Sequence, residues 1–169
     1  MEFKLKAISK AGIPEAISKA ELYRSLNEPE EAESICRDIL AVAPEHQLAL
    51  RLLGLAITDQ FSGDAADRHV EAEQLFQRLA EPYERLYYTG LLHERRAKEQ
   101  MRVGRPPHTL PPLFAEAMRC FAEAEMIRPP GNDDAVLRWN RCARLLQSHP
   151  GFQEEKESEV FEAFDSSPI

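Results

Sequence analysis

The sequence predicts an all-α fold, a helix–turn–helix repeat array, and two observations carry this prediction. Apolar residues recur at three- and four-residue steps in successive segments, and no segment has the alternation of a strand. One helical motif also recurs: an alanine, a bulky residue four positions later and a proline eight positions beyond it. It is formed by Ala32, Cys36 and Pro44, by Ala117, Phe121 and Pro129, and without the proline by Ala72 and Phe76. Such repeats indicate stacked helix pairs that bury one another's apolar faces.

The first helix pair is predicted between residues 13 and 44. Pro14 suits a first helical turn, where its missing N–H is not needed, and apolar residues continue at helical spacing as far as Leu26. Residues 27–29 end this helix and start the next one, which runs towards Pro44. Each helix is too short to be stable alone in water, so the two are expected to pack as a hairpin.

Two further pairs and a closing helix follow. The second pair is predicted from Leu48 to Leu79 with a break at residues 61–64, and the third begins after Pro82. In the third pair, one helix runs to Arg102, residues 104–107 end it, and a second helix runs from near Thr109 to Ile127. The closing helix extends from its cap at residues 132–134 to residues 149–150. The expected divisions are an N-terminal extension (1–12), a repeat domain (13–149) and an acidic C-terminal tail (150–169).

The composition narrows the classes of function. The chain has 169 residues, 43% of them hydrophobic, which suits one domain or a short array. Its net charge of −8 opposes nonspecific binding to nucleic acid or to an anionic membrane. The sequence has no signal-peptide pattern and no long apolar run, so a cytoplasmic protein is expected. The three cysteines lie in helical patterns and are expected to be small buried hydrophobes; the alternative for Cys142, beside Arg141 and Arg144, is a reactive thiol.

The register of the small residues carries a resemblance to a known family. Leu50, Leu53, Gly54 and Ile57 form a first-helix signature, and the alanine motifs form the second-helix signature. Ala20 precedes Ala32 by twelve residues, Ala32 precedes Gly54 by 22, and Ala117 precedes Trp139 by 22. Over about residues 13–148 the chain resembles tetratricopeptide repeat (TPR) proteins, whose units of about 34 residues are helix pairs. The resemblance implies a TPR-like α-solenoid of about three helix pairs plus a closing helix.

Two departures from the regular spacing are of interest for binding. Six residues are inserted between Gly54 and Ala72, and fifteen between Gly90 and Ala117, so both insertions fall between the two helices of a pair and along one edge of the array. They represent either tolerated loop growth or part of a binding surface. Binding is favoured for residues 102–112, because their prolines make the segment semi-rigid. Trp139 stands where a small residue is usual and is expected to cover the open end of the array, with a ligand-contacting aromatic as the alternative.

The family resemblance implies that first helices supply the contacts in a binding groove. The candidates are Arg24, Arg51, Leu55, Tyr87, Leu91 and Asn140, with Arg102 and Arg105 in the long connection. The basic and amide residues with which some TPR proteins clamp a C-terminal carboxylate are missing, so chaperone tails are not expected partners. A peptide that carries acids and apolar anchors fits this set better.

The acidic tail supplies two more candidates, Phe161 and Phe164, which share one helical face with Val160. Beyond Pro150 the tail has six acidic residues and one lysine, a net charge of −5. Either the tail docks on its own array or on a neighbour's, or it is a disordered, solubilising segment.

No catalytic or metal-binding pattern occurs in the sequence. The five histidines are scattered, no two cysteines are spaced for a metal, and there is no phosphate-binding loop or nucleophile elbow. We therefore expect a non-catalytic scaffold or adaptor without cofactor or metal, whose partner is a protein or peptide. The alternatives are a self-associating structural module, which would be a homo-oligomer, and a regulatory subunit of an enzyme complex.

Overall fold

The computed structural model describes residues 1–62, 66–149 and 151–152. Within these residues the chain forms seven α helices and two short 3₁₀ turns, with no strand, so the predicted all-α fold is confirmed. The helices are α1 (Ile13–Ser25), α2 (Pro29–Val42), α3 (Gln47–Asp59), α4 (Ala66–Gln77), α5 (Pro82–Arg102), α6 (Leu110–Met126) and α7 (Asp134–Ser148), and the 3₁₀ turns are η1 (Lys10–Gly12) and η2 (Pro107–Thr109). Prolines lie in the first turns of α1, α2, α5 and α6, as their fixed φ and missing N–H allow.

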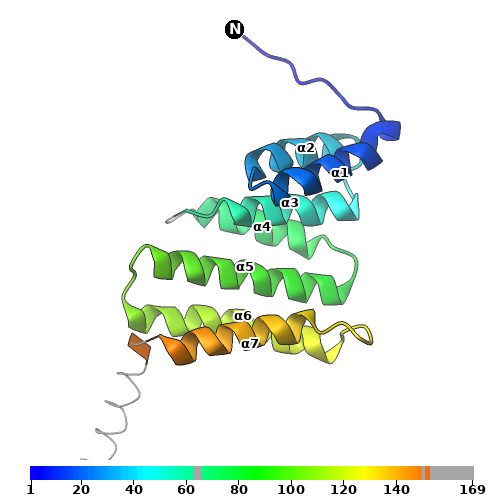
Figure 1. Cartoon of the computed structure of the whole chain (residues 1–169). Helices are drawn as coiled ribbons and strands as arrows, with labels where there is room; N and C mark the ends of the chain where they lie inside the picture. Colours follow the sequence, from blue (N-terminus) through cyan, green and yellow to red (C-terminus); the bar gives the residue numbers. More distant parts are fainter. Residues whose placement is uncertain (63–65, 150, 153–169) are drawn as a thin grey trace, which may run out of the picture.

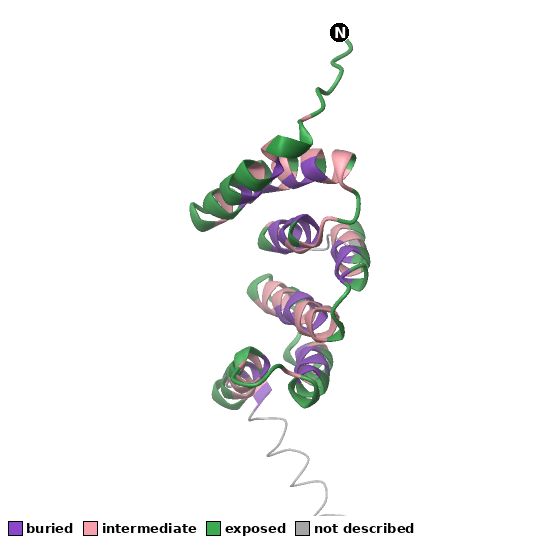
Figure 2. Ribbon diagram, turned by 90° about the vertical axis from the view of Figure 1, so that its right-hand side faces the viewer, coloured by how far each residue is buried: buried purple, intermediate pink, exposed green. Residues whose placement is uncertain are grey.

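The helices pack in sequence order as antiparallel neighbours (Figure 1). The first helices of successive pairs, α1, α3, α5 and α7, also contact one another in succession. Figure 2 shows α3, α5 and α7 along one side of the array and α2, α4 and α6 along the other. The array therefore has a surface formed by α1, α3, α5 and α7, here called the first-helix face.

Glycines on the first helices explain the register of the motif. A Cβ atom at Gly54 would lie 2.3 Å from the ring of Phe76 on α4, and one at Gly90 would lie 2.8 Å from the ring of Phe121 on α6. The bulky residue of each second helix thus fills the space that the missing side chain of the first helix leaves. Both phenylalanines are fully buried, so this contact is part of the core.

The long insertion is largely helical, and the helix ends expected at Arg102 and near Thr109 are confirmed, so the segment 102–112 favoured for binding includes the first turn of α6. Arg102 is the last residue of α5, and α6 already begins at Leu110. Only residues 103–109 connect the two helices, and three of them form η2. The sequence lengthens the helices instead of the loop because Pro111 and Pro112 fall in the first turn of α6, where proline is tolerated. The shorter connection between α3 and α4 lies at the same end of the array (Figure 1), as expected.

The three cysteines are buried, as the sequence predicts. Burial raises the pKa of the Cys36 thiol to about 12 and that of the Cys142 thiol to about 11, despite nearby arginines. These thiols are core residues and not nucleophiles, which removes the alternative of a reactive Cys142.

No helix in the described ranges is both long and apolar enough to cross a membrane. The N-terminal extension projects from the array as a chain without regular structure up to η1 (Figure 1). Its Phe3 and Leu5 side chains are 82% and 87% exposed.

Candidate functional site

The first-helix face is held together by ion pairs that join consecutive first helices. Asp59, the last residue of α3, accepts a hydrogen bond from Arg24 Nε of α1 at 2.7 Å and forms a second ion pair with Arg95 of α5. Arg95 also donates to Thr58 Oγ1 at the same helix end. One carboxylate thus bridges three helices, and both arginines reach the C-terminal end of α3, where the helix dipole favours cations.

A second ion pair links α3 and α5 further along the same face. Arg51 Nη1 donates to Glu84 Oε1 at 2.9 Å, and both side chains are about one quarter exposed. The guanidinium carbon of Arg51 lies 5.8 Å from the centre of the Tyr88 ring, within reach of a cation–π interaction. Arg51 is therefore held on two sides by its own chain.

The third junction, between α5 and α7, contains a buried charge. Glu94 of α5 is fully buried, pairs with Lys98 one turn later, and lies 3.6 Å from Arg138 Nη1 of α7. A buried carboxylate is costly without such partners. Lys98 neutralises Glu94 within α5, and Arg138 is the cation that links α5 to α7.

Tyrosines of α5 form an aromatic strip beside these ion pairs. The rings of Tyr83 and Tyr87 are stacked at 5.9 Å and nearly parallel, and Tyr83 donates through its hydroxyl to Asn132 Oδ1 at 3.3 Å. Tyr87 also contacts Tyr88 edge-on and approaches Phe121 of α6. Tyr83 and Tyr87 are both half-buried, so each presents part of a rigid ring to the surface.

The structure places the predicted groove residues in three kinds of environment. Arg24 and Arg51 are on the first-helix face, but each is already paired with a carboxylate of the chain. Tyr87 and Asn140 are half-buried on α5 and α7 and remain candidates for contact. Leu55 and Leu91 are only 7% and 4% exposed and belong to the core, so little of either side chain is available to a partner.

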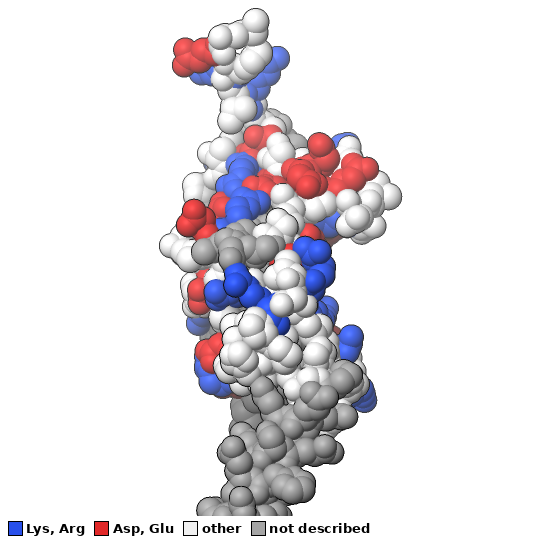
Figure 3. Space-filling model, turned by 90° about the vertical axis from the view of Figure 1, so that its left-hand side faces the viewer, with Lys and Arg blue, Asp and Glu red and all other residues white. Residues whose placement is uncertain are grey.

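The predicted loop residues lie at the end of the array that carries the α5–α6 connection (Figure 1). Arg102 ends α5 and pairs with Glu99 at 2.7 Å, while Arg105 Nε donates to Gln100 Oε1 at 3.0 Å. Figure 3 views the array from the end that carries the α3–α4 and α5–α6 connections, and acidic and basic atoms are interspersed over what is visible there. Phe161 and Phe164 lie outside the residues that the structure describes.

The pairing of Asp59, Glu84 and Arg95 with residues of neighbouring first helices was not predicted from the sequence, although the spacing of these pairs along the chain indicates it. The pairs Arg24–Asp59, Arg51–Glu84 and Asp59–Arg95 are separated by 35, 33 and 36 residues. These separations are close to one helix pair, so opposite charges at equivalent positions of successive pairs come together. A search for such spacings would have found the three contacts.

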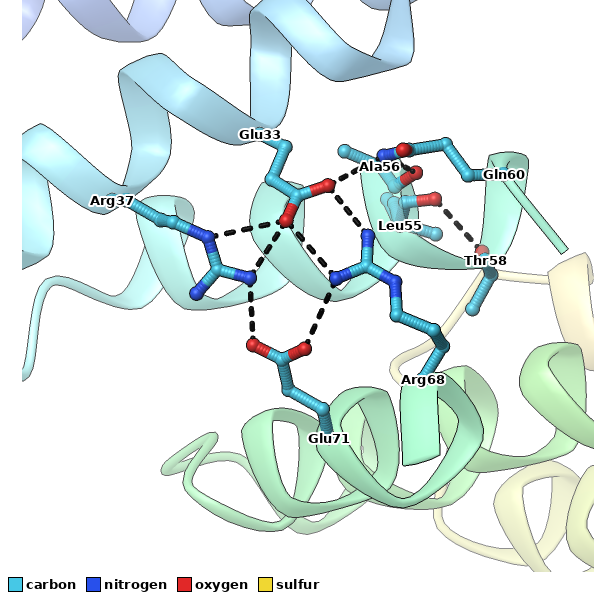
Figure 4. A network of polar contacts seen from close by, with 8 residues as sticks. All are labelled: Glu33, Arg37, Leu55, Ala56, Thr58, Gln60, Arg68 and Glu71. Atoms are coloured by element: carbon cyan, nitrogen blue, oxygen red, sulfur yellow. Dashed lines mark hydrogen bonds and ion pairs between the residues drawn. The ribbon is translucent and has the colours of Figure 1, made fainter. Parts of the chain in front are cut away.

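The second helices carry a comparable network on the other side of the array (Figure 4). Glu33 of α2 accepts from Arg68 Nη2 of α4 at 2.6 Å and from Arg37 Nη2 at 2.7 Å, and Arg37 also reaches Glu71 at 2.7 Å. Gln60 Nε2 donates to Glu33 as well, at 2.6 Å. Burial alone would raise the pKa of Glu33, but the hydrogen bonds from Arg68, Arg37 and Gln60 outweigh it and lower the pKa to about 2.

A shallow hollow of about 470 Å³ lies between α4, α5 and α6. Its walls include Glu73 of α4 and Glu116 of α6, with His93 of α5 between them. Glu116 is paired with Arg119 at 2.7 Å, and burial lowers the pKa of His93 although both carboxylates act in the opposite direction. Within the described part of the chain, no three His, Cys, Asp or Glu residues are grouped so as to hold a metal ion.

Comparison with protein-family models, with curated proteins and with solved structures gave no match. The class of protein is therefore defined by its architecture alone: an all-α array of adjacent helix pairs whose first helices are cross-linked by ion pairs.

Proposed function

We propose that this protein is a non-catalytic, TPR-like adaptor that binds a protein or peptide on its first-helix face. The observation that carries the proposal is the set of ion pairs between consecutive first helices, because it fixes four helices as one preformed surface. A preformed surface loses little conformational entropy when a partner binds.

The chemistry of the face favours a partner with aromatic or aliphatic anchors and moderate negative charge. The three ion-pair clusters contain five cations (Arg24, Arg51, Arg95, Lys98, Arg138) and three carboxylates (Asp59, Glu84, Glu94), a net charge of +2. The whole chain, in contrast, has a net charge of −8. Since Arg24 and Arg51 are already paired, the tyrosine strip supplies the anchoring surface and the excess positive charge supplies orientation.

Site-specific photocrosslinking tests this proposal. A photoreactive amino acid is placed at Tyr87 or at Asn140 in the full chain, which is then exposed to an extract of its source cells. As a matched control, the same group is placed at Glu123, an exposed residue of α6. We expect one protein to be crosslinked from both first-helix positions and not from position 123. Equal crosslinking from all three positions, or none from positions 87 and 140, contradicts the proposal.

Self-association is a second candidate function, favoured by the exposed apolar side chains of Phe3 and Leu5 in the N-terminal extension. Light scattering on the wild type and on a Phe3→Ser/Leu5→Ser variant tests it. An oligomer that becomes a monomer in the variant supports self-association, whereas a wild-type monomer at all concentrations excludes it.

A further inference from the structure

The last helix of the array has an apolar stripe that remains partly exposed. Val136, Trp139, Ala143 and Leu146 follow one another at steps of three, four and three residues, which places them on one side of α7. None of the four is fully buried, and Trp139 is 38% exposed.

The register of the array shows what this stripe would face. Trp139 occupies the position of Gly54 and Gly90, which pack against the second helices α4 and α6. The stripe therefore lies where a second helix would follow α7. At the equivalent position Gly54, even a Cβ would lie 2.3 Å from the ring of Phe76. The indole of Trp139 therefore excludes the packing seen in the other pairs. A segment that covers it must place its bulky residues on either side of the indole.

The chain beyond α7 is anchored at the C-terminal end of this helix. Phe152 is 8% exposed and joins the hydrophobic core, and its ring lies 4.4 Å from that of His149 at the C-terminus of α7. Gly151 is held as well, since a Cβ there would lie 3.0 Å from Pro107. Seventeen residues, 153–169, follow this anchored point. As a helix they would span about 25 Å, which is similar to the roughly 22 Å of the 15-residue α7.

We propose that residues 153–169 fold back along α7 of the same chain and cover Trp139. If the tail turns back so that Gln153 lies level with Ser148, Glu162 lies level with Trp139, because each is nine residues further along its own segment. An antiparallel helical tail therefore brings Phe161 and Phe164 to the two sides of the indole.

The charges of the two segments are complementary. From Ala135 to Ser148, α7 contains three arginines and no acidic residue, and Arg141 and Arg144 are exposed. The tail contains six acidic residues and one lysine. The anchored Phe152 keeps the tail at a high effective concentration, which favours its own α7 over that of a second copy.

The fluorescence of Trp139 tests the proposal directly, because the chain contains no other tryptophan. Phe161→Ser/Phe164→Ser is compared with wild type in the full chain. Leu22→Ser/Leu26→Ser is the matched control, since it removes two exposed large apolar side chains at the other end of the array. We expect the tail variant to shift the Trp139 emission to longer wavelength and to increase its quenching by acrylamide roughly twofold, with no change in the control.

Two further measurements distinguish the mode of docking. High salt on the wild type is expected to increase the quenching of Trp139, because salt screens the attraction between the acidic tail and the basic α7. The quenching of Trp139 by acrylamide is also measured over a dilution series. Quenching that does not change on dilution supports docking of the tail within one chain. Quenching that increases on dilution shows that the tail of a second copy covers Trp139 and overturns the proposal. Identical emission and quenching in the wild type and the Phe161→Ser/Phe164→Ser variant, with unchanged circular dichroism, also overturns the proposal.

Discussion

Gly54 of α3 lies against the ring of Phe76 of α4 so closely that no side chain fits between them. A Cβ at position 54 would lie 2.3, 2.7 and 2.9 Å from three carbon atoms of the ring. Phe76 is fully buried, and in a close-packed core a ring cannot move without displacing its neighbours. The same relationship joins Gly90 to Phe121, at 2.8 Å.

Gly54→Ala is therefore expected to destabilise the protein. Alanine gains about 1 kcal/mol over glycine inside a helix, but overpacking a core costs about 1–3 kcal/mol. The clash outweighs the gain at position 54, and the effect is smaller at position 90, where the ring is further away. Denaturant unfolding followed by circular dichroism measures both variants. A Gly54→Ala protein as stable as wild type contradicts the packing described above.

Asp59→Asn is expected to destabilise the protein by about 1–3 kcal/mol, because a charged acceptor is lost to two arginines at once. The Asp59 side chain is only 22% exposed, so water replaces the lost interactions incompletely. Glu15→Gln is the control: it removes the exposed pair with Lys19 and should change stability by less than about 0.5 kcal/mol. Equal unfolding midpoints for the two variants would show that Asp59 does not brace the first-helix face.

The fold could be predicted from the sequence because its signals are local. Helical periodicity and prolines in first turns locate the helices, and Ala20, Ala32, Gly54 and Trp139 set the register. The ends of the long connection were also predicted. Pro106 and Pro107 mark a break, and Thr109 before Pro111 and Pro112 marks the next helix start, which the structure has at Leu110.

The candidate site could be predicted only in part, for a physical reason. A helical residue at a given register position is exposed or buried according to the angle at which the next pair packs. Leu55 and Leu91 were expected in a binding groove and lie in the hydrophobic core. Arg24 was expected to be available to a partner, but Asp59, 35 residues away, already binds it. Such contacts depend on tertiary geometry, which periodicity along one helix does not contain.

The three native thiols are expected to react slowly with a disulfide reagent at pH 8. All are buried, and burial raises the pKa of each thiol to about 11 or 12, so the reactive thiolate is scarce. Ser18→Cys adds an exposed cysteine on α1 as a control and should release one equivalent at once. Denaturant should then expose the remaining three thiols. Fast reaction of a native cysteine in the wild type would show that the core opens locally.

Stability is expected to fall in two separate steps as the pH is lowered, and two side chains account for them. Burial, with contributions from Arg96 and His93, lowers the pKa of His69 from 6.5 to about 4 in the folded protein. Between these values the unfolded chain binds a proton that the folded chain does not, so stability decreases as the pH falls from 6.5 to 4. Glu33 acts lower down: its pKa is about 2 in the folded protein against an ordinary 4.5, so its contribution is lost as the pH falls from 4.5 towards 2.

Variants separate the two steps. His69→Gln is expected to flatten the dependence between pH 6.5 and 4 while it keeps the loss below pH 4.5, with a residual slope from the neighbouring His93, whose pKa is also lowered. Glu33→Gln should do the reverse. One proton gives a slope of up to about 1.4 kcal/mol per pH unit, which denaturant unfolding at a series of pH values resolves. His108→Gln, at an exposed position, is the control and should follow the wild type. If His69→Gln retains the full wild-type slope between pH 6.5 and 4, the acid sensitivity arises elsewhere than at the buried imidazole between α4 and α5.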